Sequence, residues 1–301
     1  MIEKRIFLLG EGESALDLCD VNQIKQLLAR HGFRFSKSMG QNFLIAPWVP
    51  REIADASGAA PGRGVVEVGP GIGPLTLELS RRAERVVSVE LDRSLLPVLS
   101  ESLAGRDNVE IVPGDILKTD IPALVREKLP GLEPVACANL PYNITTPAIT
   151  ALIEAGCFSR ITVMIQREVA RRICAAPGTA DYGAFSVYCQ YHTEPELLFD
   201  VEPACFIPAP KVTSTVIRMT PRPAPEEVDD QTHFFQVVRA SFAQRRKTLL
   251  NNLSTAFGGQ YDKEALREII AACGLPADVR GERLAIADFA ALSRALRQGR
   301  Q

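Results

Sequence analysis

A run of polar and rigid residues, ANLPYNI at 138–144, is the most chemically suggestive stretch of this 301-residue sequence. It places the side-chain amide of Asn139, then Leu140, the rigid backbone of Pro141 and the ring of Tyr142 in direct succession. Neither helix nor strand periodicity predicts this order. Such a segment can also be an ordinary turn that ends a strand, because Asn and Pro are common turn residues. The choice between turn and site depends on the sequence that precedes it.

A glycine-rich segment, EVGPGIGP at 67–74, follows an apolar run and precedes a helical pattern. Its glycines at 69, 71 and 73 are spaced E-x-G-x-G-x-G, whereas a dinucleotide fingerprint needs its third glycine at position 74. That position is Pro74, which disfavours a nicotinamide dehydrogenase. A tight turn at a helix N-terminus still lets the backbone approach a ligand closely. Because no pyrophosphate has to be held, a methionine-plus-adenosine ligand fits this loop better.

Three acidic residues stand where strands are expected to end. Glu90 lies 17 residues beyond Gly73, and a carboxylate there can accept hydrogen bonds from both ribose hydroxyls. Asp115 follows a Pro-Gly turn, where it can accept a hydrogen bond from an adenine amino group. Glu67, in an apolar strand end, is expected to be desolvated and either to orient the loop or to face a sulfonium. One such acid is often only a solvated turn residue, but the glycine loop, Glu90 and Asp115 in this order and spacing predict a ligand site at the carboxyl edge of a sheet.

Asn139 then falls where a second ligand would meet the first. An exocyclic adenine nitrogen is a poor nucleophile because its lone pair is delocalised into the ring. Acceptors for its amino hydrogens favour a pyramidal nitrogen, and we expect these to be the Asn139 amide oxygen and the Leu140 carbonyl, which Pro141 holds in place. The Tyr142 ring can stack on the base, which is worth about 1–3 kcal/mol. Positioning and electrostatics, without an obligatory general base, therefore predict methyl transfer to adenine.

Short apolar runs alternate with helical patterns before residue 222. The runs are GVVEV (64–68), ERVVSVEL (84–91), NVEIVPGD (108–115), PVACAN (134–139) and RITVMIQ (160–166). This alternation predicts an α/β fold with a parallel, Rossmann-like sheet and helices on both faces. KVTSTVIRMT (211–220) is expected to add an antiparallel strand. The prolines of PRPAPEE (221–227) predict a stiff linker, and the patterns beyond it predict a small all-α C-terminal domain.

From GFRFSKSMGQNFL to its end, the chain resembles the KsgA/RsmA family, the small-subunit ribosomal RNA adenine N6,N6-dimethyltransferases. EVGPGIG, VELD, GDIL and NLPYN are similar to the family's cofactor and catalytic motifs, and SFAQRRKTLLNNL (241–253) and RGERL (280–284) are similar to the signature of its small domain. The resemblance implies a class I methyltransferase fold and the cofactor S-adenosyl-L-methionine. It also implies that Asn42 and Leu44, in SKSMGQNFL (36–44), touch the methionine end of the cofactor. Phe206, in FIPAPKVTS (206–214), would lie over the target base opposite Tyr142.

The expected site and domain plan follow from these motifs. The expected cofactor-binding residues are Asn42, Leu44, Glu67, Gly69, Gly71, Gly73, Glu90, Asp115 and Asn139, and the expected catalytic residues are Asn139, Leu140, Pro141, Tyr142 and Phe206. Residues 15–222 are expected to form the methyltransferase domain and 226–301 the small helical domain, with 1–14 an extension to which we assign no role.

The resemblance implies transfer of methyl groups to N6 of two adjacent adenosines in the 3′-terminal hairpin loop of small-subunit ribosomal RNA, with a role in subunit biogenesis. Two other hypotheses stay open. A sister family, which dimethylates large-subunit RNA, shares the glycine loop and a similar N-x-P-Y/F motif, although the FAQRRKTLLNNL segment favours the small-subunit enzyme. A non-enzymatic assembly factor that binds immature small subunits is the second hypothesis, and it can coexist with activity.

The net charge of −2 requires that any RNA-binding surface be local. Residues 22–51, around Lys37, and residues 233–253 contain basic residues and no acid. We expect Lys37 and the run Arg245, Arg246 and Lys247 to contact phosphates, although such patches are often solvated helix faces and the two arginines can be partly structural. A further basic cluster consists of Arg160, Arg167, Arg171 and Arg172, with one acid among them.

Other features of the sequence bear on its surroundings. Seven cysteines without a CxxC pair and three histidines without HxxxH spacing predict reduced thiols and no metal site. No apolar stretch reaches the roughly 18–20 residues of a membrane span. The run IFLLG at residues 6–10 is too short for a signal peptide. We therefore expect a cytoplasmic monomer without membrane association, whose partner is ribosomal RNA within the immature small subunit.

Overall fold

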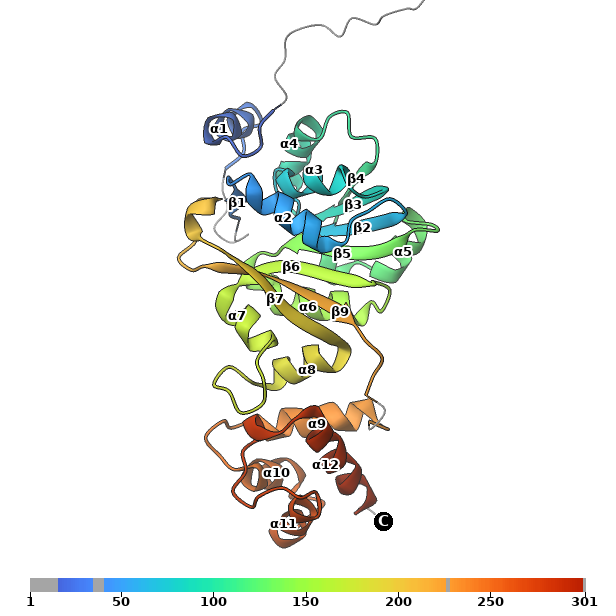
Figure 1. Ribbon diagram of the computed structural model, residues 1–301, viewed down its shortest axis with the longest axis vertical. Helices are drawn as coiled ribbons and strands as arrows, with labels where there is room; N and C mark the ends of the chain where they lie inside the picture. The colour runs from blue at the N-terminus through green and yellow to red at the C-terminus, as the bar shows by residue number, and fades with distance from the viewer. Residues whose placement is uncertain (1–15, 35–40, 226–227, 300–301) are drawn as a thin grey trace, which may run out of the picture.

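A computed structural model describes residues 16–34, 41–225 and 228–299. Its centre is a sheet with the strand order β4-β3-β2-β5-β6-β9-β7 (Figure 1). The parallel strands are β2 (Arg63–Val68), β3 (Arg85–Glu90), β4 (Val109–Pro113), β5 (Glu133–Asn139) and β6 (Arg160–Gln166). The predicted late strand is β9 (Ser214–Pro221), which pairs antiparallel with β6 as expected. The α/β fold class is thus confirmed.

One strand of the central sheet was not predicted from the sequence. β7 (Thr193–Val201) pairs antiparallel with β9 at the edge of the sheet. Its sequence, TEPELLFDV, contains a proline and several acids, and its register shifts between Leu197 and Phe199. The shift breaks the alternation of apolar and polar residues that identifies a strand in a sequence. A proline and exposed acids are tolerated here because an edge strand has only one neighbour.

Helices cover both faces of the sheet (Figure 1). α2 (Trp48–Ser57) and α3 (Pro74–Ser80) lie on one face, and α5 (Ile121–Lys128), α6 (Thr145–Glu154) and α7 (Arg167–Ile173) lie on the other. The strand residues alternate between these two layers, since Val65 packs with the first set and Val66 and Val68 pack with the second. Both layers are built from buried apolar side chains, which explains the near-continuous apolar strands.

The N-terminal elements lie near the glycine loop. α1 (Val21–Arg30) packs with α4 (Leu96–Ser102) in one apolar cluster, which also contains Phe43 and Ile72. β1 (Phe43–Leu44) pairs antiparallel with β8 (Phe206–Ile207), so that Leu44 lies opposite Phe206. Two segments more than 160 residues apart in the sequence, SKSMGQNFL and FIPAPKVTS, therefore meet at this small ribbon.

The C-terminal region consists of α9 (Gln231–Ser241), α10 (Leu249–Phe257), α11 (Lys263–Ala272) and α12 (Ile286–Gln298), which gather at the bottom of Figure 1. Their core also includes residues near and within α8 (Ala184–His192), among them Tyr182 and Tyr191. The Tyr182 hydroxyl donates to the Leu284 carbonyl oxygen at 3.0 Å. The core of the helical region thus contains residues that precede the proline-rich segment as well as residues that follow it. The domain boundary at 222–226 stays a prediction.

Candidate active site

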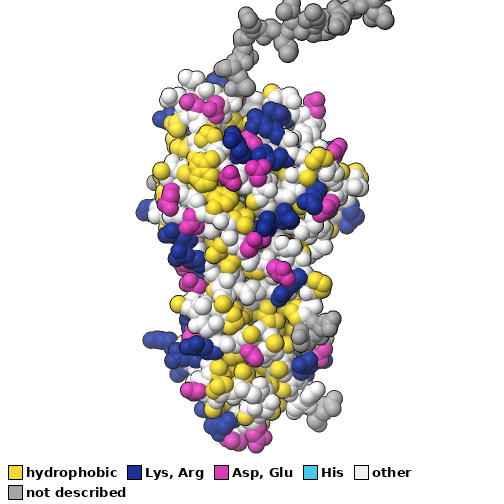
Figure 2. Space-filling view, viewed as in Figure 1, with side chains coloured by type: hydrophobic (Ala, Val, Ile, Leu, Met, Phe, Trp, Pro, Cys, Tyr) yellow, Lys and Arg dark blue, Asp and Glu magenta, His cyan; other side chains and the backbone are white. Residues whose placement is uncertain are grey.

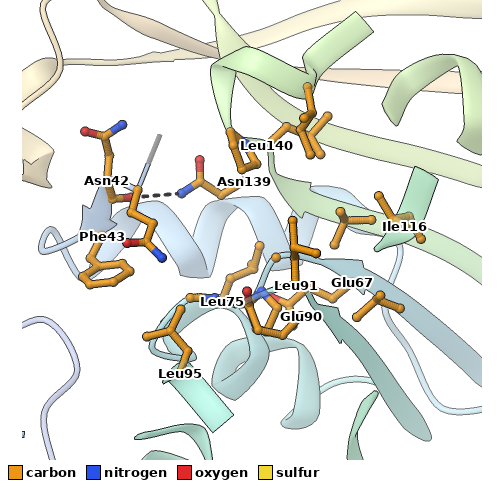
Figure 3. A pocket seen from close by; sticks show the side chains of 18 of the residues that line it. Asn42, Phe43, Glu67, Leu75, Glu90, Leu91, Leu95, Ile116, Asn139 and Leu140 are labelled. Atoms are coloured by element: carbon orange, nitrogen blue, oxygen red, sulfur yellow. Dashed lines mark hydrogen bonds between the residues drawn. The ribbon is translucent and has the colours of Figure 1, made fainter. Parts of the chain in front are cut away.

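A cavity opens at the carboxyl ends of the parallel strands (Figure 3). Of the residues expected to bind the cofactor or to act in catalysis, those that line it are Asn42, Leu44, Glu67, Gly69, Gly71, Glu90, Asp115, Asn139, Leu140, Pro141, Tyr142 and Phe206. Gly73 does not line it. Gly73 precedes α3 with a φ of 95°, and a Cβ built there would lie 3.1 Å from the Leu103 side chain. Gly73 therefore allows close packing beneath the loop and is not part of the cavity wall.

The glycine loop is fastened to the neighbouring strand. Gly69 and Gly71 have φ values of 65° and 63°, a left-handed conformation that glycine adopts without strain. The Gly69 N–H donates to the Val89 carbonyl at 3.0 Å, and the Gly71 N–H donates to the Glu90 carboxylate at 3.3 Å. A Cβ on Gly71 would lie 3.3 Å from the Phe43 ring. The loop can therefore bring its backbone close to a ligand only with glycines at these positions.

Two of the three acids stand side by side at the ends of β3 and β4. Glu90 is buried and accepts hydrogen bonds from the N–H groups of Asp92 at 2.7 Å and Gly71 at 3.3 Å. Burial raises the pKa of the Glu90 carboxyl, although these hydrogen bonds oppose the rise. Asp115 accepts from the Leu117 N–H at 3.0 Å, which leaves its second carboxylate oxygen 3.8 Å from the Lys118 ammonium. Both carboxylates line the cavity and have acceptor capacity for hydroxyl or amino groups.

The third acid, Glu67, lies at the floor of the cavity and is only 1% exposed. Its Oε2 accepts from the Ser88 hydroxyl at 2.6 Å and the Thr76 hydroxyl at 2.7 Å. Its Oε1 has no hydrogen-bond partner within the described part of the chain. Burial raises the pKa of Glu67 to about 7, against the lowering effect of the two hydroxyls. A buried carboxylate oxygen without a partner is costly and fits a cationic group placed in the cavity.

The amide of Asn139 is oriented by the N-terminal motif. Asn139 ends β5, and its Nδ2 donates to the Asn42 carbonyl at the long distance of 3.5 Å (Figure 3). With the amide nitrogen directed to Asn42, the amide oxygen Oδ1 is the atom that faces away from this contact. The next residues follow the expected geometry, because Pro141 has φ −57° and ψ 135° and leads into the short 3₁₀ helix η4 (Tyr142–Ile144).

Tyr142 is held by the first residue of β9, at the same edge of the sheet. Its hydroxyl lies 2.8 Å from the hydroxyl of Ser214, the buried first residue of β9. Burial also raises the pKa of the Tyr142 phenol. Phe206 is 3% exposed and lines the same cavity. Its expected position over a target base stays a prediction.

Two further interactions that shape the site were not predicted from the sequence. The Gln41 amide donates to the Asp92 carboxylate at 2.7 Å, and Gln41 lines the cavity. Ser214 anchors Tyr142. Both residues stand within motifs already recognised, SKSMGQNFL and FIPAPKVTS. The sequence contained no signal for their partners, because each partner is more than 50 residues away.

The expected RNA-contacting residues differ in their surroundings. Lys37 lies outside the described residues. Arg245 contacts Glu282 at 3.1 Å and donates to the Ala180 carbonyl, so it connects two loops of the helical region. Arg246 and Lys247 are exposed and form no ion pair with any residue that the structure describes. Figure 2 shows Lys and Arg side chains projecting from the left edge of the molecule at the level of this region.

Metal-binding clusters and membrane-spanning helices are both absent from residues 16–34, 41–225 and 228–299. No group of three or more His, Cys, Asp or Glu side chains there could hold a metal ion. No helix in these segments is long and apolar enough to cross a membrane.

Residues 32–291 match the family model described as ribosomal RNA adenine dimethylase. The chain belongs to this family. The "Ribosomal RNA small subunit methyltransferase A" of Geobacillus kaustophilus is 47% identical over 284 residues, which cover 93% of this chain and 97% of that protein. The protein with the same description from Bacillus cytotoxicus is 46% identical with the same coverage. The predicted resemblance and enzyme class, an S-adenosylmethionine-dependent methyltransferase, are confirmed.

Two solved structures share the fold of this adenine dimethylase. A dimethyladenosine transferase from Plasmodium falciparum has a TM-score of 0.72 at 22% identity, covering 85% of this chain and 98% of that one. The 23S rRNA methyltransferase ErmE has a TM-score of 0.64 at 27% identity, covering 85% of this chain and 100% of that one. The relatives described as small-subunit enzymes are thus more similar in sequence than this large-subunit one.

Proposed function

We propose that the protein transfers methyl groups from S-adenosyl-L-methionine to N6 of two adjacent adenosines in the 3′-terminal hairpin loop of small-subunit ribosomal RNA. The observation that carries this proposal is the orientation of the Asn139 amide, whose Nδ2 is directed to Asn42 so that Oδ1 can accept a hydrogen bond from a substrate amino group. The identity of 47% to a protein described as a small-subunit enzyme, against 27% for ErmE, favours the small subunit as substrate.

The cavity suits the proposed cofactor. Glu90 would accept from the ribose hydroxyls and Asp115 from the adenine amino group, while Asn42 and Leu44 would contact the methionine end. The loop of Gly69 and Gly71 would let the backbone approach the ligand. The unpartnered Oε1 of Glu67, in a wall otherwise rich in apolar side chains, provides the negative charge that a sulfonium cation needs. When bound, S-adenosyl-L-methionine supplies an electrophilic methyl group on this sulfonium.

The residues of the chain would orient the target nitrogen rather than remove its proton. Asn139 Oδ1 and the Leu140 carbonyl accept the two N6 hydrogens and draw the nitrogen towards a pyramidal shape. The Tyr142 ring, held through its hydroxyl by Ser214, stacks on the base and fixes its plane. No side chain has to remove a proton beforehand, because the methylated nitrogen is cationic and releases its proton readily. The rate gain would come from positioning and fixed dipoles.

The partner follows from the same assignment. We propose that the protein acts as a monomer on the immature small subunit in the cytoplasm. Arg246 and Lys247 are the stronger candidates for phosphate contacts in the C-terminal region, because Arg245 is engaged by Glu282 and Ala180. Lys37 would add a further phosphate contact. Removing any one of these basic side chains should flatten the salt dependence of RNA affinity, because fewer counterions are then released on binding.

The test is methylation of small ribosomal subunits isolated from cells that lack this protein. Mass spectrometry of digested RNA should show N6,N6-dimethyladenosine at two adjacent positions. Asn139→Ala should lower kcat by about 10²–10³-fold, by analogy with the loss of one oxyanion donor, while subunit affinity changes little. Modification confined to large-subunit RNA would refute the assignment of substrate. Turnover close to that of the wild type in Asn139→Ala would refute the mechanism alone.

A further inference from the structure

A second hollow lies outside the cavity, between α7 and the edge of the sheet. Its walls are Arg167 and Arg171 of α7, residues 197–200 of β7, and Thr215 of β9. Arg167 and Arg171 are one helical turn apart, which places their side chains on the same face. We call this hollow the α7–β7 groove.

The structure divides the arginine cluster that the sequence suggested. Arg160 begins β6 and therefore lies at the amino end of the strands, away from the cavity. Arg172 pairs with Glu168 at 3.0 Å and does not line the groove. Of these four arginines, only Arg167 and Arg171 line the groove, near the carboxyl edge of the sheet. The cluster is thus two arginines facing a common hollow, with two others directed elsewhere.

The groove combines an apolar wall with positive charge. Leu197 is 49% exposed, which is unusual for a large apolar side chain in a strand. Phe199 lies beyond the register shift of β7 and packs beside Trp48 of α2, so Leu197 is the apolar side chain that shares the face of α7. Arg171 is exposed and forms no ion pair with a described residue. Arg167 is only loosely paired, with its guanidinium 3.5 Å from the Asp200 carboxylate. An apolar surface beside an uncompensated guanidinium suits a nucleotide, whose base is apolar on its faces and whose phosphate is anionic.

The groove is also joined to the candidate active site by direct contacts. The Arg167 N–H donates to the Thr213 carbonyl at 3.0 Å. Thr213 precedes Ser214, which holds Tyr142, and Thr215, which lines the groove, follows it. The first residues of β9 therefore contact the proposed base-stacking ring on one side and form the wall of the groove on the other. An RNA strand that enters the cavity at Tyr142 would pass this point.

We propose that the α7–β7 groove binds the nucleotide next to the target adenosine in the RNA strand. Its base would rest on Leu197, and its phosphate would pair with Arg171. This inference rests on the proposed function, which requires that one of two adjacent adenosines enter the cavity while its neighbour is held outside. The groove would keep the strand in register between the two rounds of methylation.

Matched variants on one helix test the charge. Arg171→Ala removes the groove arginine, and Arg172→Ala removes its neighbour, which has the same charge and lies outside the groove. Binding is measured with a naked RNA hairpin of the 3′-terminal sequence at several salt concentrations. Arg171→Ala should raise the Kd for this hairpin about tenfold, the weaker end of the range for a charge-assisted hydrogen bond. It should also flatten the slope of log K against log salt by about 0.7–0.9. Arg172→Ala should match the wild type in both measurements, and kcat on isolated small subunits should be unchanged in both variants.

Leu197→Ala and an abasic substrate test the apolar wall. Removing the base next to the target should weaken binding severalfold to the wild type. It should weaken binding little further to Leu197→Ala, because the truncated side chain no longer supports that base. Equal abasic effects in both proteins would overturn the placement of the base. Equal salt slopes for Arg171→Ala and Arg172→Ala would overturn the groove as an RNA site.

Two further outcomes separate this proposal from its alternatives. If Arg171→Ala weakens binding to intact small subunits but not to the hairpin, the groove contacts a ribosomal protein and the proposal is wrong. If the wild type fails to methylate small-subunit RNA, the proposed function is wrong, and the salt slopes on the hairpin still decide whether the groove binds RNA. Far-ultraviolet circular dichroism and thermal melts establish that each variant is folded.

Discussion

Replacing Glu67 by Gln should remove a pH-dependent term from the stability of the protein measured without cofactor. Burial raises the pKa of Glu67 from its ordinary 4.5 to about 7, so the folded protein binds this proton more tightly than the unfolded chain. The stabilisation from that proton is complete below about pH 4.5 and is lost as the pH rises through about 7. Between pH 5 and pH 8 the linkage relation gives a loss of about 2.5 kcal/mol.

The assay is denaturant unfolding at pH 5 and pH 8 for the wild type, Glu67→Gln and a control, Glu84→Gln, which changes an exposed acid just before β3. Other carboxyls titrate in the same range, so the informative quantity is the difference between wild type and variant at each pH. This difference should move by about 2.5 kcal/mol for Glu67→Gln, with the wild type relatively less stable at pH 8, and by little for the control. An unchanged difference would show that Glu67 is already ionised in the folded protein at pH 5.

The same residue links pH to the proposed cofactor. If ionised Glu67 faces the sulfonium, S-adenosyl-L-methionine should bind more tightly to the wild type as the pH rises through about 7, the pKa of the carboxyl. S-adenosyl-L-homocysteine is uncharged at sulfur and should show a weaker pH dependence. In Glu67→Gln, the affinities for both ligands should vary little with pH. Calorimetry that finds the same pH profile for both ligands in the wild type would refute a pairing of Glu67 with the sulfonium.

Three other substitutions have defined outcomes. Tyr142→Phe should keep the ring and most of kcat. It should lower the free energy of unfolding by about 1 kcal/mol, because the buried Ser214 hydroxyl loses its partner. Unchanged stability would argue against that hydrogen bond. Gly71→Ala should destabilise the protein by about 1–2 kcal/mol and weaken cofactor binding, because the backbone φ is 63° at this position. A wild-type stability in thermal melts and a wild-type cofactor affinity in calorimetry would contradict this prediction. Arg245→Ala should lower the free energy of unfolding by about 0.5–1 kcal/mol in denaturant titrations. Arg246→Ala should instead flatten the salt slope of RNA binding without a change in stability. The reverse pattern would exchange their roles.

The sequence by itself determined the fold class and the family. Strands that alternate with helices produce a parallel sheet because each strand has to return to the same edge, and this places Glu90, Asp115 and Asn139 at one edge without further information. The glycine spacing predicted a ligand loop for a local reason, the left-handed conformation at Gly69 and Gly71. These inferences depend on residues close in sequence, for which pattern and conformation are tightly coupled.

Only the tertiary structure decided which distant residues meet. The β1–β8 ribbon, the amide of Asn139 directed at Asn42, and the hydroxyl of Tyr142 on Ser214 each join segments at least 70 residues apart. No periodicity encodes such partners, because they depend on how layers stack after the chain has folded. The same reason explains why β7 was missed and why four arginines of one predicted cluster separated. Arg160 and Arg167 stand at opposite ends of one buried strand, and the length of that strand, not their spacing in the sequence, assigned them to different edges of the sheet.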